Sequence, residues 1–177
     1  MRKIHKITGR FLSALFLFTL IVQATPAEDL FAPKVTPPKN IENRSFWMQM
    51  IESWNIPGKS EVQVPAYPGA YIVGFMPASE MTSNGVKSKT FPSIVLATSD
   101  EKAKVTEFYK EKLKEWKYES MMDMFDIFWT GRDEFNSMDI DQATSTENIN
   151  IMDAMQPHKD FMPDAKTTIT IVYKPEK

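Results

Sequence analysis

Apolar residues recur at helical spacing in two stretches of the chain. In the first, Trp47, Met50, Ile51 and Trp54 stand at i, i+3, i+4 and i+7, which predicts an amphipathic helix of about three turns. The Pro57-Gly58 dipeptide then stops it. In the second, a capping-box pair precedes one apolar stripe with Lys and Glu on the opposite face. The pair is Thr98 and Glu101, and the stripe is Val105, Phe108, Tyr109, Leu113 and Trp116. This pattern is typical of a surface helix that packs by one side on a sheet.

Other stretches alternate with a period of two or form short apolar runs, as β-strands do. They are residues 71–76, 93–98, 117–130, 149–151 and 167–173. Residues 77–90 are polar and contain Asn84-Gly85, which predicts a hairpin or a loop. The order of elements predicts an α+β fold of two layers. We expect an antiparallel sheet of about four to five strands (βαβββ-like), with helices on one face and the additional N-terminal amphipathic helix.

The first residues of the chain have the pattern of a secretory signal peptide. Four basic residues precede residues 11–22, which carry no charge and are much shorter than the roughly 20 residues that span a bilayer as a helix. Val22-Gln23-Ala24 predicts cleavage after residue 24, with an alternative site after Ala27. We therefore expect a bacterial protein that is periplasmic or secreted, with no stable membrane span once the signal is cleaved. Residues 25–40 contain four prolines and suit an extended tether to a single domain, residues 41–177.

Net charge and cysteine content exclude several kinds of partner and covalent attachment. Removal of residues 1–24 takes four of the 21 Lys and Arg and none of the 23 Asp and Glu, which leaves a formal charge of −6. An acidic chain is repelled by a phosphate backbone, so no nucleic-acid partner is expected. The chain contains no cysteine, so neither a disulfide framework nor lipid attachment through a cysteine is available to it.

Two motifs of the chain form a recognisable pattern. The first motif is Tyr67-Pro68-Gly69-Ala70, which precedes a strand. The second is Thr98-Ser99-Asp100 followed by the stripe of Val105, Phe108-Tyr109, Leu113 and Trp116. Together they resemble a recurrent pattern in a group of small exported bacterial domains of uncharacterised function, and the resemblance covers roughly residues 62–130 and the last strand. It implies a βαβββ-type fold and says nothing about mechanism. Many members are lipoproteins, and this chain departs from them because it lacks the acylated cysteine.

A second, looser similarity is to the glyoxalase-like fold, whose modules also place an aromatic helix after a strand. That resemblance implies a metal-dependent enzyme with His and Glu ligands from paired modules. After removal of the signal peptide the chain contains one histidine, His158, and has room for one module. No catalytic motif with a nucleophile is present, so the sequence favours a protein that is not an enzyme.

His158 lies between two methionines, Met155 and Met162. Two thioethers and an imidazole are ligands that suit Cu(I), so this segment is a candidate copper site. The alternative is a loop histidine beside methionines that fill gaps in a small core.

The helix with two tryptophans is the candidate partner-binding surface. Trp47, Met50 and Trp54 could contact a protein partner, because aromatic residues are enriched at interface hot spots. Alternatively the same stripe closes the domain's own sheet. The leading functional hypothesis is an exported binding or accessory protein for a protein partner or a small apolar ligand, which uses the exposed sheet face or the groove beside this helix. Copper handling through the Met/His segment and a glyoxalase-like enzyme are the alternatives.

Overall fold

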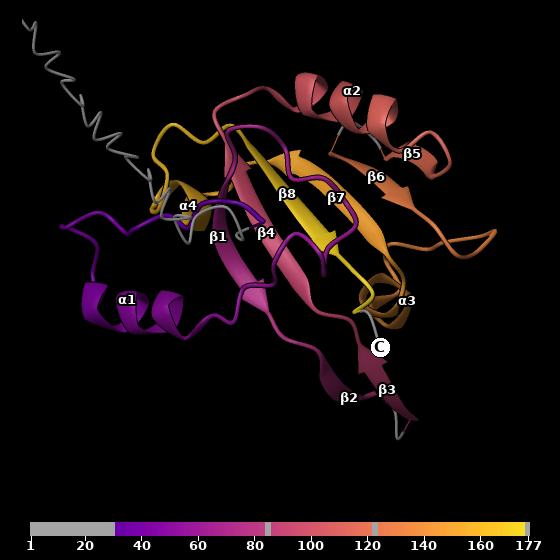
Figure 1. Ribbon diagram of the computed structural model, residues 1–177, viewed down its shortest axis with the longest axis horizontal. Coiled ribbons are helices and arrows are strands. Elements are labelled where there is room, and N and C mark those ends of the chain that lie inside the picture. Colours follow the sequence, from indigo (N-terminus) through magenta and orange to yellow (C-terminus); the bar gives the residue numbers. More distant parts are fainter. Residues whose placement is uncertain (1–30, 84–85, 122–123, 176–177) are drawn as a thin grey trace, which may run out of the picture.

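The computed structural model describes residues 31–83, 86–121 and 124–175, and contains a six-stranded antiparallel sheet (Figure 1). Neighbouring strands of the sheet follow the order β1-β4-β8-β7-β6-β5. Their bounds are β1 Tyr71–Met76, β4 Ser93–Thr98, β8 Thr167–Val172, β7 Asn148–Asp153, β6 Phe125–Trp129 and β5 Lys117–Met121. A separate hairpin consists of β2 Ser79–Ser83 and β3 Val86–Thr90. The helices are α1 Arg44–Ser53, α2 Lys102–Lys112, α3 Ile140–Ser145 and α4 Gln156–Lys159.

The α+β class and the antiparallel sheet are confirmed, but the sheet is larger than the predicted four to five strands. The extra strand arises because residues 117–130 form two strands, β5 and β6, that pair from Lys117↔Trp129 to Met121↔Phe125. The prediction of one strand failed because the connection carries no Gly or Pro and the apolar alternation runs through it. Part of that connection, residues 122–123, lies outside the described residues.

The first face of the sheet is formed by large apolar residues that meet in cross-strand rows. Ile94, Ile171, Ile149 and Phe128 form one row, and they are at most 1% exposed. The neighbouring row contains Leu96, Ile169 and Ile151, each with 0% exposure. Helix α2 covers this face, and the rings of Tyr109 and Phe128 lie 6.2 Å apart. Burial of each such side chain contributes roughly 1.5–3 kcal/mol, so these rows form the main core.

The second face is also covered, whereas the two-layer prediction placed helices on one face only. The loop after β6 returns over it, and Phe135 stacks on Trp129 with 5.6 Å between ring centroids. Helix α3 and the β2–β3 hairpin stand over the strands from β7 to β1 on this face, because residues of both line a groove whose floor is the sheet. Residues 131–146 therefore form a partial third layer, on the face opposite α2.

The N-terminal part of the described chain packs against β1. Phe31 and Ala32 are buried, and Lys34 pairs in parallel with Ile72. Residues 25–30 of the predicted tether lie outside the described residues. The Lys34 ammonium also donates hydrogen bonds to the carbonyls of Ile51 and Trp54, at the C-terminal end of α1. A cation is favourable at that end of a helix. These contacts join α1 to the edge of the sheet, while the predicted signal peptide lies outside the described residues.

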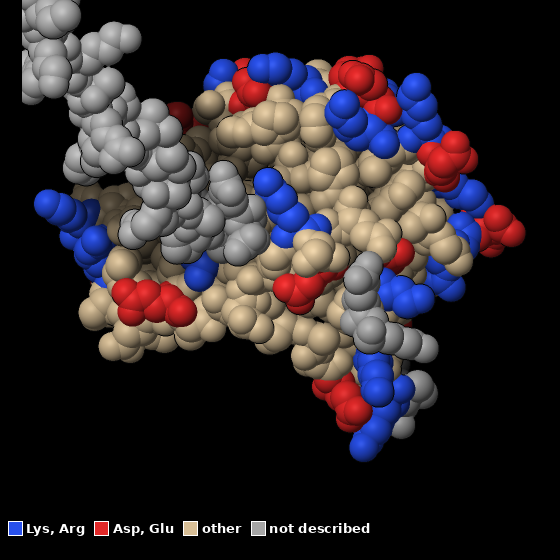
Figure 2. All heavy atoms as spheres, viewed as in Figure 1, with Lys and Arg blue, Asp and Glu red and all other residues tan. Residues whose placement is uncertain are grey.

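Helix α2 is shorter than its apolar stripe predicts, since it ends at Lys112, before Leu113 and Trp116. Glu101 rather than Thr98 holds the N-cap position. The described helices include none with the length and apolar character of a membrane span. On the face in Figure 2, Lys and Arg lie interspersed with Asp and Glu over α2 and the neighbouring strands.

A buried carboxylate links α2 to the sheet. Asp126 on β6 is 6% exposed and accepts hydrogen bonds from the Thr106 hydroxyl at 2.6 Å and the Tyr118 hydroxyl at 3.0 Å. Burial by itself would raise the pKa of Asp126, but the hydroxyl donors of Thr106, Ser120 and Tyr118, together with the charge of Lys102, outweigh it and lower the pKa.

We expect Asp126→Ala to lower the free energy of unfolding by about 3 kcal/mol, because it leaves the buried Thr106 hydroxyl and the part-buried Tyr118 hydrogen bond without their acceptor. Urea denaturation measures the change. Asp133→Ala is the matched control, since Asp133 forms an exposed ion pair with Lys117 and its loss should cost at most about 1 kcal/mol. Equal losses in the two variants would contradict the structural role of Asp126.

The lowered pKa of Asp126 also predicts a dependence of stability on pH. The unfolded chain binds the proton more tightly than the folded one, so this stabilisation is fully present above the unfolded pKa, about 3.9. It is lost as the pH falls from that value through the folded pKa. The unfolding free energy of Asp126→Asn should therefore fall less steeply than that of the natural protein below about pH 4. The expectation would be overturned if the unfolding free energies of the two proteins fell in parallel with decreasing pH.

Candidate functional site

The two motifs that carry the family resemblance meet in space and stabilise the fold. The Tyr67 hydroxyl donates a hydrogen bond to the Asp100 carboxylate at 2.7 Å, and its ring lies edge-on to Phe108 with 5.2 Å between centroids. The Tyr109 hydroxyl donates to the carbonyl of Pro65. Burial and the bond to Asp100 raise the pKa of Tyr67 to about 12, so the phenol stays protonated as a donor. The segment before β1 is thereby held on α2.

The predicted copper ligands lie on and around α4. Met155 is 53% exposed, whereas His158 is half-buried and Met162 packs against the core. Backbone hydrogen bonds join the His158 amide to the Met155 carbonyl and the Met162 amide to the His158 carbonyl. Burial lowers the pKa of His158, and its Nδ1 is buried without a hydrogen-bond partner among the described groups. Within the described residues, no three His, Cys, Asp or Glu side chains are grouped to hold a metal ion.

The predicted partner-binding stripe faces the interior of the protein. Trp54 is 9% exposed and belongs to the core, and Trp47 and Met50 are half-buried against it. Trp47 also packs edge-on against Phe161, with 5.3 Å between ring centroids. The exposed aromatic residue of this helix is Phe46, whose side chain is 60% exposed.

A groove of about 330 Å³ crosses the second face of the sheet. Its floor comes from the central strands, where Ser93, Val172 and Asn148 form one cross-strand row and Thr170 and Asn150 lie in the next. Its walls come from the end of β1, the β2–β3 hairpin and α3. The lining residues are Met76, Pro77, Ser79, Thr90, Phe91, Ser93, Ala143, Thr144, Asn148, Asn150, Met152, Thr170 and Val172.

Hydrogen bonds join the β2–β3 hairpin to α3 along the groove. The Phe91 amide, just after β3, donates to the Thr144 carbonyl of α3 at 2.7 Å. The Ser88 hydroxyl of β3 donates to the Asp141 carboxylate at 3.1 Å. Asp139 is the N-cap residue of α3, and its side chain accepts a hydrogen bond from the Gln142 backbone amide. The hairpin and α3 therefore form one connected wall.

Two polar atoms on the floor of the groove have no partner among the described groups. Ser93 Oγ and Asn150 Oδ1 are buried and make no hydrogen bond. Asn148, two residues from Asn150 on the same face, differs, because its Nδ2 donates to the carbonyls of Ala143 and Thr146, both at 2.8 Å. Buried polar groups in native proteins are almost always paired, so such an exception points to a ligand or to strain.

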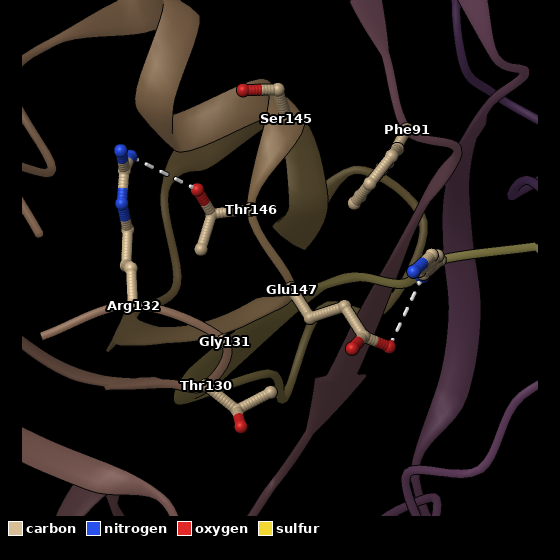
Figure 3. Close-up of a pocket in the computed structure, with 8 residues that line it drawn as sticks. Phe91, Thr130, Gly131, Arg132, Ser145, Thr146 and Glu147 are labelled. Carbon is tan, nitrogen blue, oxygen red and sulfur yellow. Dashed lines mark hydrogen bonds between the residues drawn. The ribbon is translucent and has the colours of Figure 1, made fainter.

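A polar pocket of about 350 Å³ adjoins the groove at the end of the sheet (Figure 3). It is lined by Phe91, Thr130, Gly131, Arg132, Ser145, Thr146, Glu147 and Lys174. Phe91 lines both spaces. At the end of α3, Thr144 lines the groove, whereas Ser145 and the C-cap residue Thr146 line the pocket. Arg132 Nη1 lies 3.4 Å from Thr146 Oγ1. Glu147 accepts a hydrogen bond from the backbone amide of Lys174 at 3.2 Å.

Sequence reasoning missed the residues of both spaces. The run Asn148-Ile149-Asn150-Ile151 contained a usable signal, because alternation places two amides together on the face opposite the isoleucines of a central strand. The walls gave no such signal, since they join residues 76–93 with residues 143–147, which are far apart in the chain.

Comparisons of the chain with family models, with curated proteins and with solved structures found no match.

The unpartnered amide predicts a contrast between two asparagines on one strand. Asn150→Val should raise the free energy of unfolding by about 1 kcal/mol, because it removes a polar atom that is buried without a hydrogen bond. Asn148→Val should lower it by about 2 kcal/mol, because it leaves two carbonyls without their donor. Chemical denaturation of both variants tests the pair. If both variants lost a similar amount of unfolding free energy, the Asn150 amide would have a hydrogen-bond partner in solution and the contrast would be wrong.

Proposed function

We propose that the protein is an exported bacterial binding protein, not an enzyme, that holds a small and largely apolar ligand in the groove on the second face of its sheet. The observation that carries this proposal is the pair of buried, unpartnered polar atoms, Ser93 Oγ and Asn150 Oδ1, on the floor of a mostly apolar groove. Ligand sites commonly combine an apolar lining with a few polar groups that set the orientation.

The lining restricts the ligand's chemistry. None of the residues that line the groove within the described chain is charged. A charge buried there would lose its hydration without gaining an ion pair, so the part of the ligand inside the groove is uncharged. Ser93 can donate or accept a hydrogen bond, and the Asn150 amide can do either after rotation about its last bond. A ligand group such as a hydroxyl or an amide would pair with them.

Two methionines supply the apolar contacts. Met76, at the end of β1, is 58% exposed, and Met152 lies half-buried on β7. Methionine is unbranched and adapts its shape to different apolar surfaces. Each methylene group that the ligand buries contributes about 0.8 kcal/mol. These contacts support binding of a range of apolar bodies rather than one rigid shape.

The same lining favours binding over catalysis. Acid–base chemistry needs a titratable side chain within hydrogen-bond reach of the reacting atoms, and the residues that line the groove supply none. The export step rests on the predicted signal peptide, residues 1–24.

Binding can be measured with N-phenyl-1-naphthylamine, whose fluorescence rises in apolar surroundings. Titration of the purified protein should give saturable binding, and Thr170→Trp should weaken it at least about tenfold, because the indole would fill the floor of the groove. Glu119→Trp is the control, since Glu119 is an exposed residue of β5 that does not line the groove. It should bind like the natural protein.

Both variants should keep the natural unfolding midpoint, so that a loss of binding is not a loss of folding. Absence of saturable binding by the natural protein, or equal weakening by Thr170→Trp and Glu119→Trp, would overturn the proposal.

A further inference from the structure

The polar pocket beside the groove contains two cationic side chains with no ion-pair partner among the described residues. They are Arg132, in the loop after β6, and Lys174, just after β8. The ion pairs of the described chain join other residues, and most of them lie along α2 and its ends. The one carboxylate in the pocket, Glu147, accepts a hydrogen bond from a backbone amide. The pocket therefore carries a net positive charge of one.

The ends of three strands bring these residues together. Trp129, Asn148, Val172 and Ser93 form one cross-strand row at this end of the sheet. Thr130 and Arg132 follow Trp129 on β6, Glu147 precedes Asn148 on β7, and Lys174 follows Val172 on β8. The pocket thus sits directly beyond the row that begins the floor of the groove. In Figure 3, Arg132 stands on one side of the pocket and Phe91 on the other.

The groove and the pocket have opposite characters and share a wall. Phe91 and the last turn of α3 border both spaces, whose volumes are about 330 and 350 Å³. The groove offers an uncharged, mostly apolar lining, and the pocket offers a guanidinium and an ammonium beside the Ser145 and Thr146 hydroxyls. A molecule with an apolar body and a single anionic end matches this arrangement along its length.

We propose that the ligand of the groove is a monocarboxylate with an apolar chain, whose carboxylate lies in the polar pocket against Arg132 and Lys174. This inference rests on the proposed function, because it assigns the second end of the same ligand. The planar guanidinium of Arg132 can donate two parallel hydrogen bonds to a carboxylate. Among the described residues Arg132 makes one hydrogen bond, at 3.4 Å to the Thr146 hydroxyl, so its remaining donors are available to such a ligand.

Decanoate and decanol separate the two halves of this inference, because they share the chain and differ in the charged end. Each is titrated as a competitor of N-phenyl-1-naphthylamine. Decanoate should bind the natural protein at least about fivefold more tightly than decanol. Arg132→Gln and Lys174→Gln should each weaken the binding of decanoate about fivefold to tenfold and leave the affinity for decanol unchanged. Glu147→Gln should increase the affinity for decanoate, because it removes the negative charge from the pocket. Lys114→Gln, on the turn after α2, is the control for a general loss of positive charge.

The outcomes are distinct. Equal affinity for decanoate and decanol, or equal effects of Arg132→Gln and Lys114→Gln on decanoate, would overturn the carboxylate assignment and leave the groove proposal intact. Loss of decanol binding in Arg132→Gln would show that this residue acts on the groove itself, and would also overturn the assignment. If neither compound displaces the dye from a folded natural protein, the proposed function fails together with the inference.

Discussion

The register of the three central strands, β4, β8 and β7, is the constraint on which the rest of the structure depends. Each contributes two aliphatic residues to adjacent rows on the first face, such as Ile94, Ile171 and Ile149. The side-chain period of a strand is two, so a slip of one residue would turn every one of these side chains away from α2. The cost of exposing the rows therefore also sets which residues face the other way. Ser93, Thr170 and Asn150 form the floor of the groove because the isoleucines occupy the core.

This coupling explains how an unpartnered amide persists in the middle of a sheet. A buried polar atom without a hydrogen bond costs on the order of 1–3 kcal/mol. The fully buried aliphatic residues of the first face each stabilise the fold by a comparable or larger amount, so the fold tolerates the defect. Asn148 on the same strand has both of its donors paired, so the register itself does not prevent an asparagine from being satisfied at this face. A site that is less stable than it could be is typical of functional positions.

How much of the molecule could be predicted from the sequence depends on the range of the interaction. Local periodicity and short apolar runs were enough for α1, for most of α2 and for β1, β4, β7 and β8. The turn between β5 and β6 was missed because no turn residue interrupts the apolar pattern of residues 117–130. The tryptophans of α1 were identified as an apolar stripe, but the pattern could not distinguish burial on the domain from a docking surface. That choice required Phe161, more than a hundred residues later, which packs on Trp47.

The candidate site was beyond sequence reasoning for the same physical reason. Its floor is a property of strand alternation and was partly visible in the asparagines of β7. Its walls exist because the Phe91 amide bonds to Thr144 and Ser88 bonds to Asp141, across more than fifty residues of chain. These few contacts are also the main hydrogen bonds between the hairpin and α3, whereas the sheet below is bonded along every strand. The wall is therefore less firmly held than the floor, and elements that open around a ligand are generally drawn from such weakly held parts of a fold. Because Phe91 borders both the groove and the polar pocket, a ligand that spans the two would bear on the same residue that joins the hairpin to α3, and its binding would strengthen the contact that forms its own site.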